Sequence, residues 1–572
     1  MKLLLGLFFV LLILYYLHPI PLQGPNVDLG HHLLLGKIIT ETRNIPTINL
    51  LSFTYPNYPF INTHWLSDVI FYLFQTYFGF NGLIFLALGL MTGAFFLVFK
   101  TALKHGKILS ALLVASVYLQ ILINRTEVKP ELFSLFLLSP FIFILYKFKH
   151  KFTKWVFFLI PLEFLWVNLH LYFIVGLGVL SIFTLDAFIT EKEKWRSKKF
   201  QTLFFVTLCS GLATLINPNF IKGVIFPFNF FQNYGFKVIE NNNFFKAVIP
   251  YGDITFIYIG FSSLALVAGL IIIRKKVSFV DILLSAFFIF LAIFAVRNFS
   301  LFVFGTFIPA VKVLSLGLET ILKRVAKQKA GKVKAIAFFL VVVIIFSGIF
   351  WNFKLHGIGF GIIDNGSEAV SFVNKNNIHG PIYNNYNIGN YLEYKLYPKE
   401  RVFVDGRPEG YPKEFFEKEY YPAEGSIEGF NKVDKKYNFN VIFYEHKNQT
   451  QNANPLLNGL IKSNEWKIVY LNSSIVIFLK NNSQNEKTIS KFGLTEKNTT
   501  VPGNLSNSSD YRELSNFYRV VGWFTPMFQA DLKYLQYDPN NCVALRHVAI
   551  VMKNTNHPEA PIYITRYTQN CQ

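Results

Sequence analysis

Long apolar runs separated by short polar loops fill the first two thirds of the chain. A run of roughly 17–25 apolar residues is long enough to cross the hydrocarbon core of a bilayer as a helix. Eleven such spans are predicted, at residues 3–18, 80–99, 108–124, 131–146, 155–170, 172–189, 203–220, 256–273, 278–296, 299–318 and 335–352. A helix at 66–78 precedes the second span and would lie in the membrane interface or continue into that span. The pattern predicts a polytopic α-helical membrane domain over residues 1–352.

The pattern changes after residue 353, where segments with helical spacing alternate with short runs of β-branched and aromatic residues. A helix is predicted at 366–377, and strands are predicted at 381–383, 401–404, 440–443, 467–470 and 474–478. Residues 353–480 are therefore expected to form an α/β domain. The stretch 481–510 is rich in Asn, Ser and Thr, which is typical of a polar linker.

Residues 511–572 are predicted to form a small helical tail with a weak tetratricopeptide pattern. The positions that match the repeat are Tyr511, Leu514, Tyr518, Gly522 and Pro539. Because one repeat is not stable alone, the tail would be a helical hairpin docked on the α/β domain or a truncated interaction module. Cys542 and Cys571 could form a disulfide in an oxidising compartment, although their spacing alone does not establish it.

The composition agrees with a membrane protein. Hydrophobic residues make up 52% of the 572 positions, and charged residues make up 16%. A soluble domain has about 25% charged residues. These values exclude a soluble enzyme, a disordered chain and a small disulfide-rich secreted module.

The net charge of +21 belongs mainly to the membrane domain, which holds 31 Lys and Arg against 13 Asp and Glu. If Lys2 is cytoplasmic, 22 of these cations lie in inner loops and eight lie in outer loops. The positive-inside rule then places the N-terminus inside, and the 19–65 loop and the α/β domain outside. The basic loops would contact anionic membrane lipids, and no nucleic acid partner is required. The predicted location is the cell (inner or plasma) membrane.

Polar residues directly after the first predicted span are the first candidates for chemistry. If this segment is a helix, Asp28, His31 and His32 lie at i, i+3 and i+4 on one face. A carboxylate there can act as a general base towards a hydroxyl or amine, or bind a divalent metal ion together with His32. The structural alternative is that Asp28 caps the helix. His64 and Asp68 have the same i, i+4 spacing and would form a second catalytic cluster near Asp28.

Three of the eight outer-loop cations are candidate phosphate ligands, because topology does not require a cation there: Arg125, Lys129 and Arg297. Arg is suited to holding phosphate oxygens, and at a bilayer edge the phosphate would belong to a lipid head group or a lipid-linked substrate. The alternatives are ion pairs with Glu127 or Glu131, or snorkelling. Other polar residues at outer helix ends are Asn168, His170 and Asn298. Together with His31 and His32, these side chains are predicted to bind substrate.

Asp405 and Arg407 place two opposite charges at the tip of the predicted strand 401–404. They form a candidate acceptor site, or else a buried ion pair that fixes a turn. The sequence contains no phosphate-cradling loop and no nucleophile elbow, which argues against an ATP-driven pump.

At these residues the chain resembles the multi-spanning C-type glycosyltransferases (GT-C), which include the protein O-mannosyltransferases and the lipid A aminoarabinose transferase. It is more similar still to a bacterial branch of glycosyltransferase-like membrane proteins. The motifs that carry the resemblance are Asp28-x-Gly-His-His, Arg43-Asn-Ile-Pro, Ser52-Phe-Thr, Asn62-x-His-Trp-Leu-x-Asp, Asn124-Arg-Thr-Glu, Trp166-Val-Asn-Leu-His, Arg297-Asn and Phe403-Val-Asp-Gly-Arg. They cover residues 1–480.

The resemblance implies a polyprenyl-phosphate sugar donor and attack on the outer face by a glycan, lipid or protein acceptor. Asp28 would be the first-loop carboxylate, serving as a base or as part of an acid/base site, and outer-edge Arg residues would hold the donor phosphate. Many relatives carry paired acidic residues in this loop, whereas here Asp28 is followed by His31 and His32. This departure leaves the use of a metal ion open.

Four functions follow from these features. The first is a hexosyl or pentosyl transferase that uses a lipid-linked donor. The second is a polymerase or ligase of surface glycans, and the third is a transporter or flippase of a lipid-linked precursor. A transporter would favour polar residues at mid-membrane, whereas here they gather at outer helix ends. The fourth is a non-catalytic assembly protein that docks through its tail.

Overall fold

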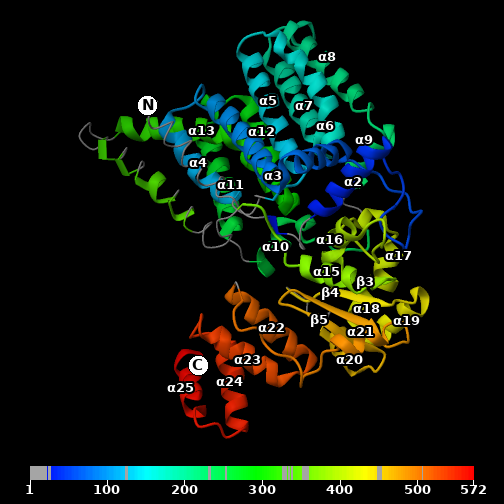
Figure 1. Cartoon of the computed structure of the whole chain (residues 1–572). Coiled ribbons are helices and arrows are strands. Elements are labelled where there is room, and N and C mark those ends of the chain that lie inside the picture. The colour runs from blue at the N-terminus through cyan, green and yellow to red at the C-terminus, as the bar shows by residue number, and fades with distance from the viewer. Residues whose placement is uncertain are drawn as a thin grey trace.

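The computed structural model describes residues 22–23, 28–122, 127–229, 234–251, 254–324, 360–447, 454–505 and 507–571, with parts of 331–350. The predicted span at 3–18 and the predicted phosphate ligand Arg125 lie outside the described residues. The chain folds into a helical bundle, a domain of helices and strands against one end of that bundle, and a helical tail beyond it (Figure 1). The domain of residues 360–480 is called the outer domain, after the side of the membrane on which the sequence predicts it.

The bundle is built from the apolar runs of the sequence, whose Phe, Leu, Ile and Val side chains form one large core. Its main helices are α3 (Trp65–Ala102), α4 (Ile108–Leu122), α5 (Glu131–His150), α6 (Leu159–Leu169), α7 (Phe173–Thr190), α8 (Lys198–Ala213), α11 (Ile254–Ile272), α12 (Phe279–Phe294) and α13 (Phe299–Arg324). Shorter helices follow α8, namely α9 (Phe220–Asn229) and α10 (Phe244–Tyr251). Among the described residues, five helices are long and apolar enough to cross a membrane. The total of eleven spans stays a prediction.

The helix predicted at 66–78 and the span predicted at 80–99 form one element, α3. Gly79 interrupts it with a positive φ of 65°, a conformation that residues with a side chain rarely adopt. The two segments therefore meet at a kink, and α3 begins at Trp65 with Asp68 in its first turn.

Charged side chains from several helices pair with one another at the other end of the bundle. Lys312 lies inside a predicted span and its Nζ contacts Asp281 Oδ2 at 2.6 Å. Asp281 also accepts a hydrogen bond from the Tyr146 hydroxyl at 2.7 Å, and Lys149 pairs with Asp186. These pairs join α5, α7, α12 and α13, as charges near a membrane require. The inside orientation of this end stays a prediction.

The outer domain contains a four-stranded sheet in the order β3-β4-β6-β5. Its strands are β3 (Ile382–Asn384), β4 (Val441–Glu445), β5 (Trp466–Leu471) and β6 (Ile475–Lys480), and only the pair β3 and β4 is parallel. Its helices are α15 (Ser367–Lys375), α16 (Tyr386–Leu396), α17 (Lys413–Phe415), α18 (Tyr421–Gly425), α19 (Ile427–Tyr437) and α20 (Asn454–Lys462). Successive residues of β4 face two different cores, so the sheet is covered on both sides.

The prediction of a strand at 401–404 was wrong. Among the described residues, this segment makes only isolated bridges, in which Val402 pairs with Ser52 on one side and Ile382 on the other. The apolar residues that suggested a strand are buried for a different reason, because they lie between the sheet and a loop from the membrane domain.

The tail consists of α22 (Ser508–Val521), α23 (Phe524–Leu535), α24 (Cys542–Asn554) and α25 (Ala560–Cys571). Phe517 and Tyr518 of α22 belong to the core of the outer domain, and Asn458 Nδ2 donates to the Val520 carbonyl at 2.9 Å. The tail is therefore docked on this domain through its first two helices. A disulfide joins Cys542 to Cys571. The predicted linker 481–510 contains one helix, α21 (Glu486–Phe492), which packs against β5.

Candidate functional site

The helix α2 (Leu29–Thr42) lies between the bundle and the outer domain (Figure 1). Its glycines allow the backbones to approach closely on both sides. A Cβ atom at Gly30 would stand 2.2 Å from the carbonyl oxygen of Asn390, and one at Gly36 would stand 2.1 Å from the carbonyl oxygen of Asp68. His31 and His32 are both buried, so neighbouring elements cover this face of α2.

Asp28 occupies the N-cap position of α2. Within the described part of the chain its side chain accepts no capping hydrogen bond. It instead contacts Lys129 Nζ at 3.4 Å and accepts from Asn390 Nδ2 at 3.3 Å. The side chain is 45% exposed, which leaves the carboxylate accessible to a ligand. The structure therefore favours a partly exposed, ion-paired carboxylate over the capping role.

Lys129 holds a positive charge beside Asp28. Its Nζ also contacts Glu127 Oε2 at 2.7 Å. Burial opposes the charge of this ammonium, but the carboxylates Asp28, Glu127 and Glu240 more than offset that effect and hold the pKa of Lys129 above its ordinary value. Lys129 therefore remains positively charged beside Asp28. Its ion pair with Glu127 is one of the alternatives that the sequence left open.

Four histidines form a chain behind Asp28. The ring centroids of His31 and His32 lie 3.9 Å apart, those of His32 and His64 lie 5.9 Å apart, and those of His64 and His170 lie 5.1 Å apart. Burial, followed by neighbouring imidazoles and cations, lowers the pKa of both His31 and His64. These two rings are therefore neutral around pH 7, and each can accept a proton or donate one hydrogen bond.

Asp68 is fully buried and fixes His32. Its Oδ1 lies 2.6 Å from His32 Nδ1, and its Oδ2 accepts from Asn62 Nδ2 at 2.8 Å. Because a carboxylate only accepts, Nδ1 of His32 carries the hydrogen and its Nε2 is turned away from Asp68. The geometry suits a positioning role for Asp68. Its predicted catalytic role stays a prediction.

Arg297 lies on η5 (Val296–Asn298), at the start of α13. Its Nη1 donates to Asn241 Oδ1 at 3.1 Å, and its charge contributes to lowering the pKa of His64. Asn298 is buried, donates to the Leu291 carbonyl at 2.9 Å and accepts from the Tyr172 hydroxyl at 2.9 Å. Arg297 thus lies near the histidine chain. The hydrogen bonds of Asn298 hold the turn at the start of α13 in place.

Asn168 and His170 connect helices. Asn168 Oδ1 accepts from Trp65 Nε1 at 2.9 Å, and His170 Nδ1 lies 2.8 Å from the hydroxyl of Ser134. Both side chains are buried, so in this structure they support the end of the bundle. A groove of about 580 Å³ opens beside them, and it is lined by Trp65, Leu66, Phe164, Leu165, Asn168, Leu215, Ile216, Asn217 and Pro218.

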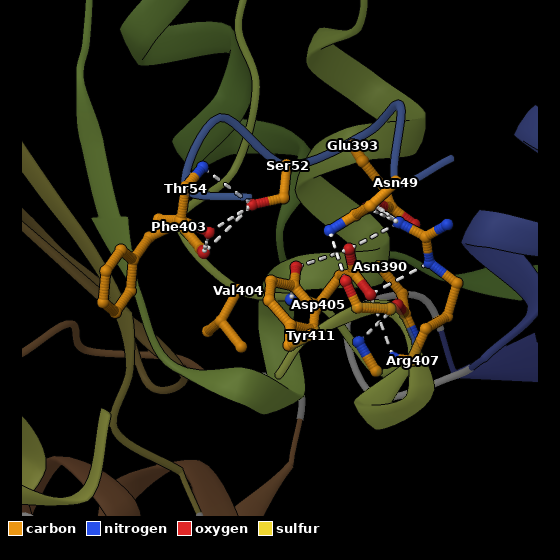
Figure 2. Close-up of polar contacts among 12 residues, drawn as sticks. Asn49, Ser52, Thr54, Asn390, Glu393, Phe403, Val404, Asp405, Arg407 and Tyr411 are labelled. Atoms are coloured by element: carbon orange, nitrogen blue, oxygen red, sulfur yellow. Dashed lines mark hydrogen bonds and ion pairs between the residues drawn. The ribbon is translucent and has the colours of Figure 1, made fainter. Parts of the chain in front are cut away.

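Asp405 and Arg407 form a buried ion pair (Figure 2). The Arg407 guanidinium donates to Asp405 at 3.0 Å and 2.6 Å, and Nη2 also donates to Asn49 Oδ1 at 3.0 Å. The Tyr411 hydroxyl donates to Asp405 Oδ2 at 2.8 Å. Both charged side chains are at most 2% exposed. Of the two alternatives that the sequence left open, this geometry favours the ion pair that fixes a turn.

The residues that link this turn to Asp28 were not predicted. Asn390 donates to Asp28 and accepts from the backbone N–H of Gly406 at 2.8 Å. The Tyr386 hydroxyl donates to the Gly406 carbonyl at 2.8 Å. Asn390 and Tyr386 lie within an ordinary helical pattern, and no sequence signal distinguished them. The first outer loop and the outer domain therefore build one continuous polar network.

In the described ranges, no group of three or more His, Cys, Asp or Glu side chains has an arrangement that could hold a metal ion. Asp28 and His32, the pair considered from the sequence, have separate partners in Lys129 and Asp68. As placed, Asp28 and His32 therefore do not form a metal site.

No protein-family model and no curated protein matches the chain. Solved structures do match. The archaeal oligosaccharyltransferase AglB from Archaeoglobus fulgidus, in complex with an inhibitory peptide and a dolichol-phosphate, has a TM-score of 0.58 and 10% identity, over 93% of this chain and 85% of that chain. An oligosaccharyltransferase from the same archaeon, in complex with zinc and sulfate, has a TM-score of 0.56 and 11% identity over the same shares.

The chain has a GT-C fold. This confirms the resemblance predicted from the sequence. A third structure, of the A. fulgidus oligosaccharyltransferase tethered to an acceptor peptide, matches with a TM-score of 0.55 and 10% identity, over 84% of this chain and 74% of that chain. At such low identities the similarity establishes the fold of this chain and not its reaction.

Proposed function

We propose that the protein is a membrane glycosyltransferase that transfers a sugar from a polyprenyl-phosphate donor to an acceptor on the outer face of the membrane. One observation carries the proposal: an accessible carboxylate, Asp28, stands beside the cation Lys129 where the bundle meets the outer domain. The GT-C fold supports it, because the similar AglB structure contains a dolichol-phosphate. The donor of this chain would share that chemistry, a phosphate on a long isoprenoid chain.

Asp28 would take the proton from the acceptor hydroxyl or amine as that group attacks the anomeric carbon of the sugar. The bond from this carbon to the phosphate oxygen then breaks, and polyprenyl phosphate leaves with the electron pair. Lys129 and Arg297 would hold the phosphate oxygens, because fixed cations stabilise the charge that develops on the leaving group. The sequence adds Arg125 to this set.

The histidine chain would contribute polar groups to the substrate site beside Asp28. The ring of His32 is fixed by Asp68, and neutral rings at His31 and His64 can donate or accept a hydrogen bond to a sugar hydroxyl. The Asp405–Arg407 pair would act indirectly. It fixes the turn at Gly406, whose N–H donates to Asn390, and Asn390 donates to Asp28. The identity of the sugar is left to experiment.

The test is transfer by the full chain reconstituted in liposomes, with a panel of radiolabelled polyprenyl-phosphate sugars. Asp28→Asn keeps the shape of the side chain but removes the base, so transfer is expected to fall at least about 100-fold. Glu41→Gln is the matched control, because Glu41 is an exposed carboxylate on the same helix. Full activity in Asp28→Asn would remove the role of Asp28. Movement of intact donor across the bilayer without transfer would support the transporter instead.

A further inference from the structure

Residues 234–243 form a strap that links the outer domain to the end of the bundle where Arg297 lies. The strap stands between α9 and α10 in the chain and contains one short helical turn, η3 (Ile239–Asn241). One end of the strap packs on helices of the outer domain, and the other end is bonded to η5. The strap therefore contacts both large parts of the protein beside the candidate site.

The outer-domain end of the strap is held by an aromatic stack. The Phe236 ring lies on the Tyr386 ring, with centroids 3.8 Å apart and planes inclined by 16°. The Tyr421 ring is nearly parallel to Phe236 at 6.0 Å, and the Tyr421 hydroxyl accepts from the Lys237 N–H at 3.1 Å. Gly235 has a φ of 83°, and a Cβ atom there would stand 2.6 Å from a backbone carbonyl oxygen of the outer domain. This end of the strap therefore fits closely, and the ring stack stabilises it.

The bundle end of the strap is bonded to the turn that carries Arg297. The guanidinium Nη1 of Arg297 donates to Asn241 Oδ1 at 3.1 Å. Beside this bond, the Val296 N–H donates to the Asn242 carbonyl at 3.0 Å. The Asn241 N–H donates to the Val238 carbonyl at 3.1 Å within the strap. The side-chain bond to Arg297 is therefore supported by backbone bonds on both of its sides.

The bond from Asn241 limits how the Arg297 guanidinium can turn. The five N–H groups of a guanidinium lie in one plane, so a bond at Nη1 fixes the direction in which that plane is presented. A side chain that is already oriented loses less conformational entropy when it binds an anion. The amide oxygen of Asn241 also orients the group without cancelling its positive charge, as a carboxylate in this place would.

The strap and the first outer loop contact the same helix of the outer domain. Tyr386, on which Phe236 stacks, is the first residue of α16. Asn390, which donates to Asp28, lies one turn further along this helix. Residues four apart lie on one face of a helix. One face of α16 therefore carries the contact that holds Asp28 and the contact that, through the strap, holds Arg297.

We propose that Asn241 is a positioning residue, which orients Arg297 for the donor phosphate, and that the stack of Phe236 on α16 holds Asn241 in place. This inference rests on the proposed glycosyltransferase function, in which Arg297 binds that phosphate. Neither residue gives or takes a proton in this role. Donor binding then depends on the contact between the outer domain and the bundle, whereas acceptor binding does not depend on the strap.

The test is steady-state transfer by the full chain in liposomes, with the donor and acceptor concentrations varied separately. Asn241→Ala releases the guanidinium, so KM for the donor should rise about tenfold while KM for the acceptor stays within about twofold. Phe236→Ala should give the same pattern, and Phe236→Tyr, which keeps the ring, should keep the wild-type value. Combining Asn241→Ala with Phe236→Ala should add little to the larger single effect, because both act through one bond.

Two exposed residues provide the matched controls. Asn374→Ala removes an exposed amide from α15, and Phe245→Ala removes an exposed ring from α10. Both variants should match the wild-type KM values. The unfolding midpoint of each detergent-solubilised variant shows whether its fold is retained, and Phe236→Ala decides by the same values should Asn241→Ala fail to fold.

A second measurement does not require transfer. Binding of polyprenyl phosphate without a sugar to the solubilised protein should weaken about tenfold in Asn241→Ala. Unchanged donor KM and unchanged lipid binding in this variant, or an equal rise in KM for donor and acceptor, would overturn the inference. A wild-type protein that binds polyprenyl phosphate but transfers from no donor is a different result. It would remove the proposed function, and the binding measurement would still decide the role of Asn241.

Discussion

At the residue scale, Asp28 fits two sequence patterns, that of a helix N-cap and that of a catalytic carboxylate. It stands at the N-cap of α2, where Asp is favoured, yet its side chain contacts Lys129 and Asn390. Local sequence could not decide between capping and chemistry, because both partners are far from Asp28 in the chain. Asn390 is 362 residues away.

Arg407 is the residue whose loss should matter most for stability. Arg407→Met would leave Asp405 buried without its partner, next to Glu393, whose carboxyl lies 3.9 Å from the Arg407 guanidinium. Breaking a buried ion pair costs about 3–5 kcal/mol. We therefore expect a clear drop in the unfolding midpoint of the detergent-solubilised protein. Arg401→Met, at an exposed position of the same segment, is the control, and equal midpoints for the two variants would contradict the assignment.

At the element scale, the segment 401–404 shows tertiary context overriding local propensity. Its β-branched and aromatic residues predict a strand, and the structure buries all three apolar ones. One side of the segment bridges to Ile382 of β3, and a loop from the membrane domain lies on the other side. The Phe53 N–H donates to the Val402 carbonyl at 3.1 Å, and the Ser52 and Thr54 hydroxyls donate to the Phe403 carbonyl (Figure 2). Such a partner cannot be found from a local pattern.

Docking of α2 against α16 depends on Gly30. A Cβ atom there would stand 2.2 Å from the Asn390 carbonyl oxygen, closer than any real contact, so Gly30→Ala must push the two helices apart. Overpacking of this kind destabilises by about 1–3 kcal/mol and should also move Asp28 away from Asn390. We expect both a lower unfolding midpoint and reduced transfer. Gly211→Ala is the control, since no described atom lies within 4 Å of a Cβ at that position.

At the scale of the whole molecule, the first outer loop joins the two large parts of the protein. The strand β1 (Leu22–Gln23) pairs with β2 (Ile362–Ile363), and Phe60 packs its ring 4.9 Å from the Arg407 guanidinium. The candidate site therefore exists only when bundle and outer domain are in contact. Both α2 and the outer domain must also lie on the same side of the membrane.

Topology is tested by cysteine labelling in intact cells. Asn44→Cys, in the first outer loop, should react with a membrane-impermeant thiol reagent, and Lys151→Cys, in a predicted inner loop, should react only after the cells are opened. Both positions are exposed, so reactivity reports the side of the membrane. Cys542 and Cys571 are joined in a disulfide, and Cys209 is replaced by Ser to remove background. The opposite labelling pattern would invert the predicted orientation.

The sequence by itself determined the membrane class, the positions of most helices, four of the five predicted strands and the first outer loop as the place to look for chemistry. These depend on local periodicity and on runs of apolar residues, which a single chain displays directly. Only the tertiary structure decided which polar residues meet. It joined Asp28 to Lys129 and Asn390, and it paired Asp405 with Arg407 in a buried turn. The physical reason is that burial and pairing of charges depend on contacts between segments hundreds of residues apart, which no local pattern encodes.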